Sequence, residues 1–251
     1  MFPVPVPAGF NVIAHRGASG YAPENTRAAF ALAAEMGAGD VELDVQLSAD
    51  GVPLLCHDTT LERYGHGPRA VEACAAAELL ALDMGSFFSP YFFAGEKMLT
   101  LEGLFEAFGE GFTYHVEIKG KAPGLPRRTV DAIASAGLEG RCVLTSFSYA
   151  ALEAAGACCD LPLGWLVQEI DDDSLRRAEA LNLRQLCPRA DRVDAGAVQK
   201  ARRAVAQVRA WGASGRPEEV AAKIRNAAGS GCDGITLNWP DWAAAEKRDG
   251  G

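Results

Sequence analysis

The sequence predicts an α/β protein built as a (β/α)8 TIM barrel. From residue 11 onward, eight short strand-like runs alternate with longer helical patterns, which is typical of a parallel sheet covered by helices. The chain of 251 residues has the size of one such barrel, and its 49% apolar content can fill one core. We therefore expect residues 1–251 to form a single domain, with residues 59–98 as an insertion within it.

The strand-like runs are rich in β-branched or aromatic residues and are separated by glycine, proline or polar residues. In chain order they are 11–15, 41–47, 112–119, 142–147, 163–168, 183–187, 206–211 and 233–238. Apolar residues at helical spacing between them predict helices over 26–36, 126–136, 171–181 and 218–228. Crossovers of this kind place the helices outside the strands.

One segment after the second strand breaks the alternation. Residues 52–58 follow that strand after a turn at 48–51, which is too short for a parallel crossover, so we expect an antiparallel hairpin. Residues 59–98 contain no clear strand and have a run of aromatic residues between Phe87 and Phe93. We expect this insertion to lie over one end of the barrel, and its aromatic run to form a small core rather than a lipid-binding patch.

The composition excludes several classes of function. A formal net charge of -9 argues against general binding of nucleic acid, which requires clustered Lys and Arg. No apolar stretch has the length of a membrane span, and the first ten residues lack the pattern of a signal peptide. The seven cysteines have no C-x-x-C spacing, which favours reduced core thiols. We expect a cytoplasmic protein without stable membrane association; the oligomeric state is left open.

Three carboxylates are expected to point into the barrel. Glu42 and Asp44 alternate with apolar residues along one strand, and Glu117 does so along the next parallel strand. The apolar faces suit the helix layer, so the carboxylates face inward, where they repel one another unless cations or protons balance them. Oxygen ligands suit one hard divalent cation, Mg²⁺ or Ca²⁺, better than zinc.

Basic residues near these carboxylates allow two interpretations. Arg16, Lys119 and Arg209 are able to form buried ion pairs with them, or Arg16 and Lys119 to bind an anionic oxygen. His15 ends the first strand, where a barrel strand meets its active-site loop, and the hairpin returns His57 to the same end. Two histidines beside a metal can act as acid and base, in either order.

Ordered motifs over almost the whole chain resemble the glycerophosphodiester phosphodiesterase family. They are IAHRGASGYAPENTRAAF, VELDVQLSADGVPLLCHDTTLER and VEIKG, with weaker matches at TLEGLF, TSFS, VRAWGAS and GCDGITLNWPD. The resemblance implies a barrel with an insertion after the hairpin, and hydrolysis of glycerophosphodiesters to glycerol 3-phosphate and an alcohol. It makes Glu42, Asp44 and Glu117 the metal ligands, and His15 and His57 the acid–base pair.

The resemblance also assigns the substrate contacts. Arg16 and Lys119 would bind the phosphate, and Trp211 would line the glycerol side. The chain departs from the family at Ser214, where Asn is usual, and at residues 237–240, where LNWP replaces TDYP. We expect these departures to change substrate detail rather than the reaction.

Neighbouring polar residues have structural interpretations. Asn25 and Thr26 are expected to cap the helix that follows them, and Glu24 to orient the first loop. His115 faces inward beside Glu117, and we expect it to support that carboxylate.

Other functions remain possible on the same barrel. A phosphodiesterase acting on lysophospholipid or sphingolipid head groups would need a docking segment, and no basic or amphipathic one is present. A non-catalytic glycerophosphate-binding module would not need the intact set of histidines and carboxylates. A metal-dependent aldolase would not explain His15 and His57 together.

Overall fold

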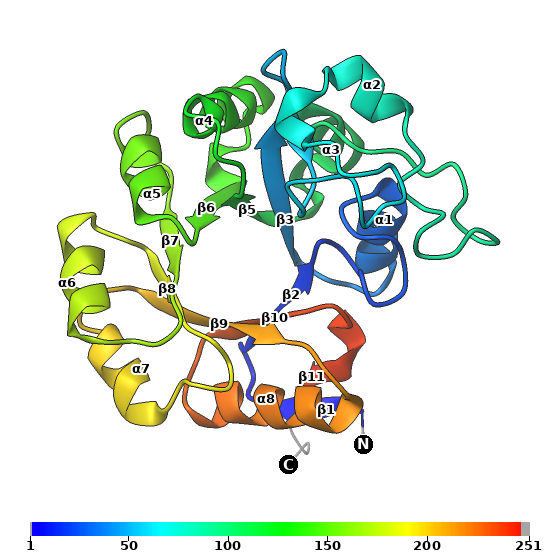
Figure 1. The fold of residues 1–251 in the computed structure, drawn as a ribbon. Helices are drawn as coiled ribbons and strands as arrows, with labels where there is room; N and C mark the ends of the chain where they lie inside the picture. The colour runs from blue at the N-terminus through cyan, green and yellow to red at the C-terminus, as the bar shows by residue number, and fades with distance from the viewer. Residues whose placement is uncertain (1, 247–251) are drawn as a thin grey trace.

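The computed structural model, which describes residues 2–246, contains a closed barrel of eight parallel strands (Figure 1). The strands are β2 (Asn11–His15), β3 (Asp40–Leu47), β5 (Thr113–Ile118), β6 (Cys142–Ser146), β7 (Leu163–Leu166), β8 (Gln185–Cys187), β9 (Gln207–Ala213) and β10 (Gly234–Leu237). The sheet closes because β2 pairs with both β3 and β10. The predicted fold class is confirmed, and each barrel strand lies within a run predicted for it or extends it by one or two residues.

Helices form the outer layer of the barrel. They are α1 (Arg27–Glu35), α3 (Leu101–Phe108), α4 (Leu125–Ala136), α5 (Tyr149–Gly156), α6 (Asp172–Ala180), α7 (Ala195–Ala201) and α8 (Pro217–Gly229). The predicted helices correspond to α1, α4, α6 and α8. The sequence analysis did not single out α3, α5 and α7, which span only seven or eight residues each.

Side-chain caps start several of these helices directly after a strand or its loop. The side chains of Thr26, Ser148, Asp171 and Asp194 accept a backbone N–H from the first turn of α1, α5, α6 and α7. Such caps satisfy N–H groups that have no partner within the helix. They therefore set where the loops around the carboxyl ends of the strands finish.

The main apolar core lies between the barrel and its helices. Outward-facing Val41, Leu43 and Val45 of β3 are fully buried in it. The same strand directs Glu42 and Asp44 to the other side, and both are buried as well. The inward face of β3 is therefore polar, while its outward face is apolar.

The segment after β3 forms the expected hairpin. Strand β4 (Pro53–Leu55) pairs antiparallel with β3. The insertion contains the 3₁₀ helix η1 (Val71–Ala73) and the helix α2 (Ala76–Ala81), which contribute Val71 and Leu79 to a separate apolar cluster.

The aromatic run of the insertion does not form the small core that the sequence suggested. Phe87 packs against Tyr64 with ring centroids 5.0 Å apart. Tyr91 and Phe92, in contrast, are 92% and 85% exposed. That prediction is wrong for the tip of the run, because mainly aliphatic and sulfur-containing side chains fill the insertion core.

Short strands from the two ends of the described chain lie side by side. Strand β1 (Val4–Val6) pairs in parallel with β11 (Ala243–Ala245), which follows the 3₁₀ helix η4 (Pro240–Trp242). Two further 3₁₀ turns, η2 (Gly109–Gly111) and η3 (Glu139–Arg141), precede β5 and β6. Within residues 2–246 the helices are too short or too polar to cross a membrane. The cytoplasmic location expected from the sequence stays a prediction.

Candidate functional site

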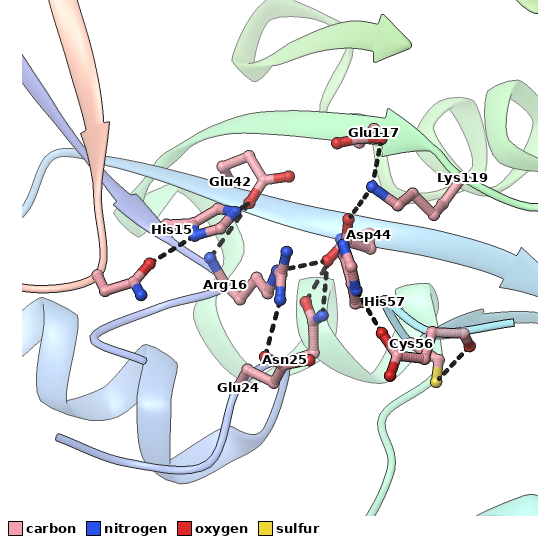
Figure 2. Close-up of polar contacts among 12 residues, drawn as sticks. His15, Arg16, Glu24, Asn25, Glu42, Asp44, Cys56, His57, Glu117 and Lys119 are labelled. Carbon is pink, nitrogen blue, oxygen red and sulfur yellow. Dashed lines mark hydrogen bonds and ion pairs between the residues drawn. The ribbon is translucent and has the colours of Figure 1, made fainter. Parts of the chain in front are cut away.

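Three carboxylates converge at the carboxyl ends of β3 and β5. The two strands pair in a register that sets Asp44 beside Glu117 and Glu42 one pleat earlier. One oxygen from each carboxylate lies within 4.8 Å of the others, and all three side chains are buried. Figure 2 shows them facing a common space. The structure therefore brings the three predicted ligands close enough to share one ion.

The carboxylate cluster is electrostatically incomplete by itself. Glu42 Oε1 and Asp44 Oδ1 are buried and have no hydrogen-bond partner among the described residues. Burial, together with the charges of Asp44 and Glu117, raises the pKa of Glu42. Burial and the Asp44 charge also raise the pKa of Glu117 to about 7, although Lys119 Nζ lies 2.8 Å from its Oε1. Buried acceptors without partners are costly, and a divalent cation fits this donor set.

Two of the three basic residues considered in the sequence do form ion pairs here. Arg16 Nε lies 2.9 Å from Asp44 Oδ2, and Lys119 Nζ lies 3.6 Å from Asp44 Oδ1. Burial opposes ionisation of Asp44, but these cations outweigh it and lower its pKa to about 2. Arg209 instead donates to the hydroxyl of Thr236. Ion pairing and a metal site are thus compatible, since Glu42 Oε1 and Asp44 Oδ1 still accept no hydrogen bond from the described residues.

His15, at the end of β2, is held by a residue that departs from the family pattern. Its Nδ1 lies 2.6 Å from Asn238 Oδ1. Because an amide oxygen only accepts, Nδ1 carries the proton, and Nε2 keeps its lone pair, 3.6 Å from Glu42 Oε2. Burial and the charge of Arg16 lower the pKa of His15 to about 3, so the ring is neutral at physiological pH.

Asn238 was expected to affect only substrate detail, and its contact with His15 was missed. The two residues are 223 positions apart in the chain. The one available signal was the position of Asn238 directly after β10, at the same end of the barrel.

His57 follows β4 and is oriented by a carboxylate. Its Nδ1 lies 2.6 Å from Asp58 Oδ1, and Asp58 Oδ2 accepts from Arg63 Nε at 2.7 Å. Burial lowers the pKa of His57, against the opposing charge of Asp44. His57 and His15 line one pocket, as the hairpin predicted.

Glu24 links the insertion to the barrel. Its Oε2 accepts from Arg63 Nη1 at 3.1 Å and from Arg16 Nη1 at 2.8 Å, and its Oε1 accepts from the Tyr64 hydroxyl at 3.0 Å. Arg63 therefore contacts both the partner of His57 and the partner of Arg16. This role of Arg63 could not be predicted from the sequence, because Arg63 and Glu24 are 39 positions apart.

Two structural interpretations need correction. Thr26 caps α1 as expected, but Asn25 does not, because its Nδ2 donates to Asp44 Oδ2 at 3.0 Å. His115 does not support Glu117; its Nε2 lies 3.0 Å from Asp40 Oδ1, near the amino ends of the strands. Asn25 therefore belongs to the carboxylate site and His115 does not.

The pocket over the carboxylates has a volume of about 220 Å³. Its lining includes both histidines, Lys119, Trp211, Ser214 and Phe147. Trp211 Nε1 donates to the Val167 carbonyl at 3.0 Å, and its ring meets Phe147 edge-on with centroids 4.8 Å apart. The aromatic pair thus forms one wall of the pocket, and Lys119 Nζ lies 5.4 Å from the centre of the Phe147 ring.

The chain is similar to proteins of one known family. The model of the "Glycerophosphoryl diester phosphodiesterase family" matches residues 15–242. A glycerophosphodiester phosphodiesterase of Caldanaerobacter subterraneus is 41% identical over 145 residues, covering 56% of this chain and 59% of the relative. A Bacillus subtilis protein named as a possible member of the same class is 45% identical over 109 residues, 43% of this chain and 44% of the relative. These alignments span about half the length of the curated relatives.

Solved structures match over a greater length. A phosphodiesterase of Oleispira antarctica, solved with the product sn-glycerol-3-phosphate, has a TM-score of 0.80 and 31% identity, covering 94% of each chain. A Silicibacter pomeroyi structure has a TM-score of 0.81 and 27% identity, covering 95% of this chain and 92% of the other. The similarity to these structures therefore extends over almost the whole chain.

Proposed function

The chain belongs to the glycerophosphoryl diester phosphodiesterase family, and we propose that it hydrolyses glycerophosphodiesters to glycerol 3-phosphate and an alcohol. One observation carries this proposal: a buried cluster of three carboxylates opens into a pocket that two imidazoles also line. The product bound to the Oleispira structure supports a small glycerophosphate substrate. A non-catalytic module would need neither the acid–base pair nor the acidic cluster.

The proposed cofactor is one divalent cation, Mg²⁺ or Ca²⁺, held by Glu42, Asp44 and Glu117. Their oxygens are closely spaced, and carboxylate oxygens are the ligands that hard cations prefer. Glu42 and Asp44 each have one buried oxygen without a hydrogen-bond partner among the described residues. When bound, the ion would supply positive charge that offsets the negative charge of the phosphodiester. Asn25, through its bond to Asp44, would keep that ligand in position.

Arg16 and Lys119 are proposed to bind the phosphate oxygens. Both lie beside the carboxylates, and Lys119 lines the pocket with Arg16. Their cations stay protonated: burial disfavours the charged forms, but the surrounding carboxylates raise both pKa values. Fixed positive charge at this place favours the transition state, in which negative charge builds up on the phosphate. Trp211 would pack against the glycerol carbons.

His15 and His57 are proposed to move the protons. One removes a proton from a glycerol hydroxyl, which attacks phosphorus, and the other protonates the oxygen of the leaving alcohol. This step forms a cyclic phosphate, which water then opens with the two roles exchanged. The hydrogen bonds to Asn238 and Asp58 engage Nδ1 of each ring and leave Nε2 for proton transfer.

The direct test is release of glycerol 3-phosphate from glycerophosphocholine by the purified protein, with Mg²⁺ or Ca²⁺ present. We expect turnover by the wild type and an about 10³-fold slower release by a folded His15→Ala variant. Absence of glycerol 3-phosphate with every glycerophosphodiester tried, under both metals, would refute the proposed function.

A further inference from the structure

A second hollow lies next to the reaction pocket, between the loop after β5 and α5. It has a volume of about 640 Å³. It shares Glu117, Lys119 and Phe147 with the reaction pocket, so the two spaces are adjacent at a residue that is proposed to bind the phosphate. We call it the alcohol groove.

The lining of the alcohol groove is mostly apolar. It includes Ala122, Pro123, Pro126, Phe147, Ala150 and Ala154. Its two serines use their hydroxyls within the protein: Ser146 donates to the Ile118 carbonyl at 2.9 Å, and Ser148 accepts the Ala151 N–H at 3.2 Å. Apart from its charged residues, the groove therefore offers contact area rather than free hydrogen-bonding side chains.

The charges of the alcohol groove are unfavourable for a cationic group. Its charged lining residues are Glu117, Lys119 and Lys121, and Glu117 already lies 2.8 Å from Lys119 Nζ. Lys119 Nζ also lies 5.4 Å from the centre of the Phe147 ring, so this aromatic face already has a cation beside it. An ammonium group such as that of choline would find no unpaired carboxylate in the lining.

The sizes of the two spaces also differ in a way that suits a diester. The reaction pocket, at about 220 Å³, is smaller than the ~300–1,000 Å³ usual for sites that enclose drug-sized ligands. A phosphodiester carries two substituents, and in-line displacement places the leaving oxygen opposite the attacking one. The glycerol is assigned to the Trp211 wall. The second substituent of the phosphate must therefore extend from the phosphate site at Lys119 in another direction.

We propose that the alcohol groove binds the leaving alcohol and selects glycerophosphodiesters whose alcohol carries a neutral apolar chain. This inference rests on the proposed function. Apolar surface buried along Pro126, Phe147 and Ala150 stabilises the bound ester in proportion to its chain length. Phe147 separates the two spaces and contacts both substituents.

The test compares soluble glycerophosphodiesters of ethanol, butanol and hexanol with glycerophosphocholine. We expect kcat/KM to rise roughly tenfold from the ethyl to the hexyl ester, since four methylenes would be partly buried. The choline ester should have a kcat/KM below that of the butyl ester. A flat series, or a preference for choline, overturns the groove assignment while leaving the proposed function intact.

A charge placed in the groove tests the location. Ala150→Asp is expected to lower the hexyl-to-ethyl ratio of kcat/KM at least about fivefold, because the chain would meet a solvated carboxylate. Ala150 is exposed and lies in the first turn of α5, so the fold should tolerate the change.

The matched control is Ala195→Asp, which changes an exposed alanine in the first turn of α7, away from the groove. We expect this variant to keep the wild-type ratio. An equal fall in both variants, or no fall in Ala150→Asp, refutes the groove. If none of the esters is hydrolysed, the proposed function fails and the groove assignment with it.

Discussion

The two ends of the barrel interior are both polar, but they differ in how their charges are arranged. At the carboxyl ends of the strands, Glu42, Asp44 and Glu117 bring like charges together. At the amino ends, His115 faces Asp40 at 3.0 Å, and Gln185 donates to the Gln207 side chain at 2.8 Å. A polar barrel interior is therefore no sign of chemistry by itself. Like charges that converge in a buried place are the informative feature, because the neighbouring Arg16 and Lys119 still leave buried carboxylate oxygens without a hydrogen-bond partner in the described part of the chain, and a ligand or protons would balance them.

Removal of the metal should give the largest difference in activity and stability between changes at the two ends of the barrel. Chelation is expected to abolish turnover, and readdition of Mg²⁺ or Ca²⁺ to restore it. Metal should also raise the thermal midpoint of the wild type, because binding to the native state adds about 2.7 kcal/mol at one hundred times Kd. Glu42→Gln should lose that shift, and Asp40→Asn, at the amino end, should keep it. A metal-induced shift that persists in Glu42→Gln would contradict the assigned site.

Substitution of the histidines should give the next largest difference between the two ends of the barrel. We expect His15→Ala and His57→Ala each to lower kcat about 10³-fold, the usual size of acid–base contributions. His115→Asn should keep kcat within about twofold of the wild type, because its side chain contacts Asp40 and not the carboxylate cluster. Rates of glycerol 3-phosphate release, with circular dichroism to check folding, provide the measurement. A comparable loss in His115→Asn would mean that both ends take part in turnover.

Arg63 tests whether the insertion supports the carboxyl end. Its guanidinium contacts both Asp58 and Glu24, so Arg63→Gln should loosen His57 and Arg16 together. We expect kcat/KM to fall about tenfold, in the range of changes to groups that orient a site.

The control for that variant is Arg69→Gln, which removes an exposed ion pair with Glu78 in the same insertion. Exposed pairs contribute about 0–1 kcal/mol to stability, so activity and thermal midpoint should stay close to those of the wild type. Equal kcat/KM values in the two variants would show that Arg63 does not support the site.

The smallest effect is expected at the amino end. Asp40→Ala leaves His115 Nε2, a buried ring nitrogen, without its partner. We expect the free energy of unfolding to fall by about 1 kcal/mol, because an unsatisfied buried polar group is costly while this site has room for water. Urea denaturation measures the change, and kcat should not move. A large loss of activity with unchanged stability would show that the amino end, and not only the carboxyl end, takes part in turnover.

Much of the site was readable from the sequence because it depends on strand geometry. The twofold alternation of side chains places Glu42 and Asp44 on one face, and parallel neighbours place Glu117 beside them. The hairpin after β3 likewise brings His57 back to the carboxyl ends of the barrel strands, because the turn is too short for a parallel crossover. The contacts that orient these groups were not readable. Asn25 looked like a helix cap, although its side chain donates to Asp44.

The sequence by itself determined the barrel, the inward carboxylates and the end at which His15 and His57 lie, because local backbone periodicity and crossover length set all of these. Only the tertiary structure decided that the Asn238 side chain contacts His15, that Glu24 forms an ion pair with Arg63, and that an apolar groove lies beside Lys119. Such contacts join loops from different βα units, and their distances depend on barrel closure and side-chain rotamers rather than on any repeat in the chain.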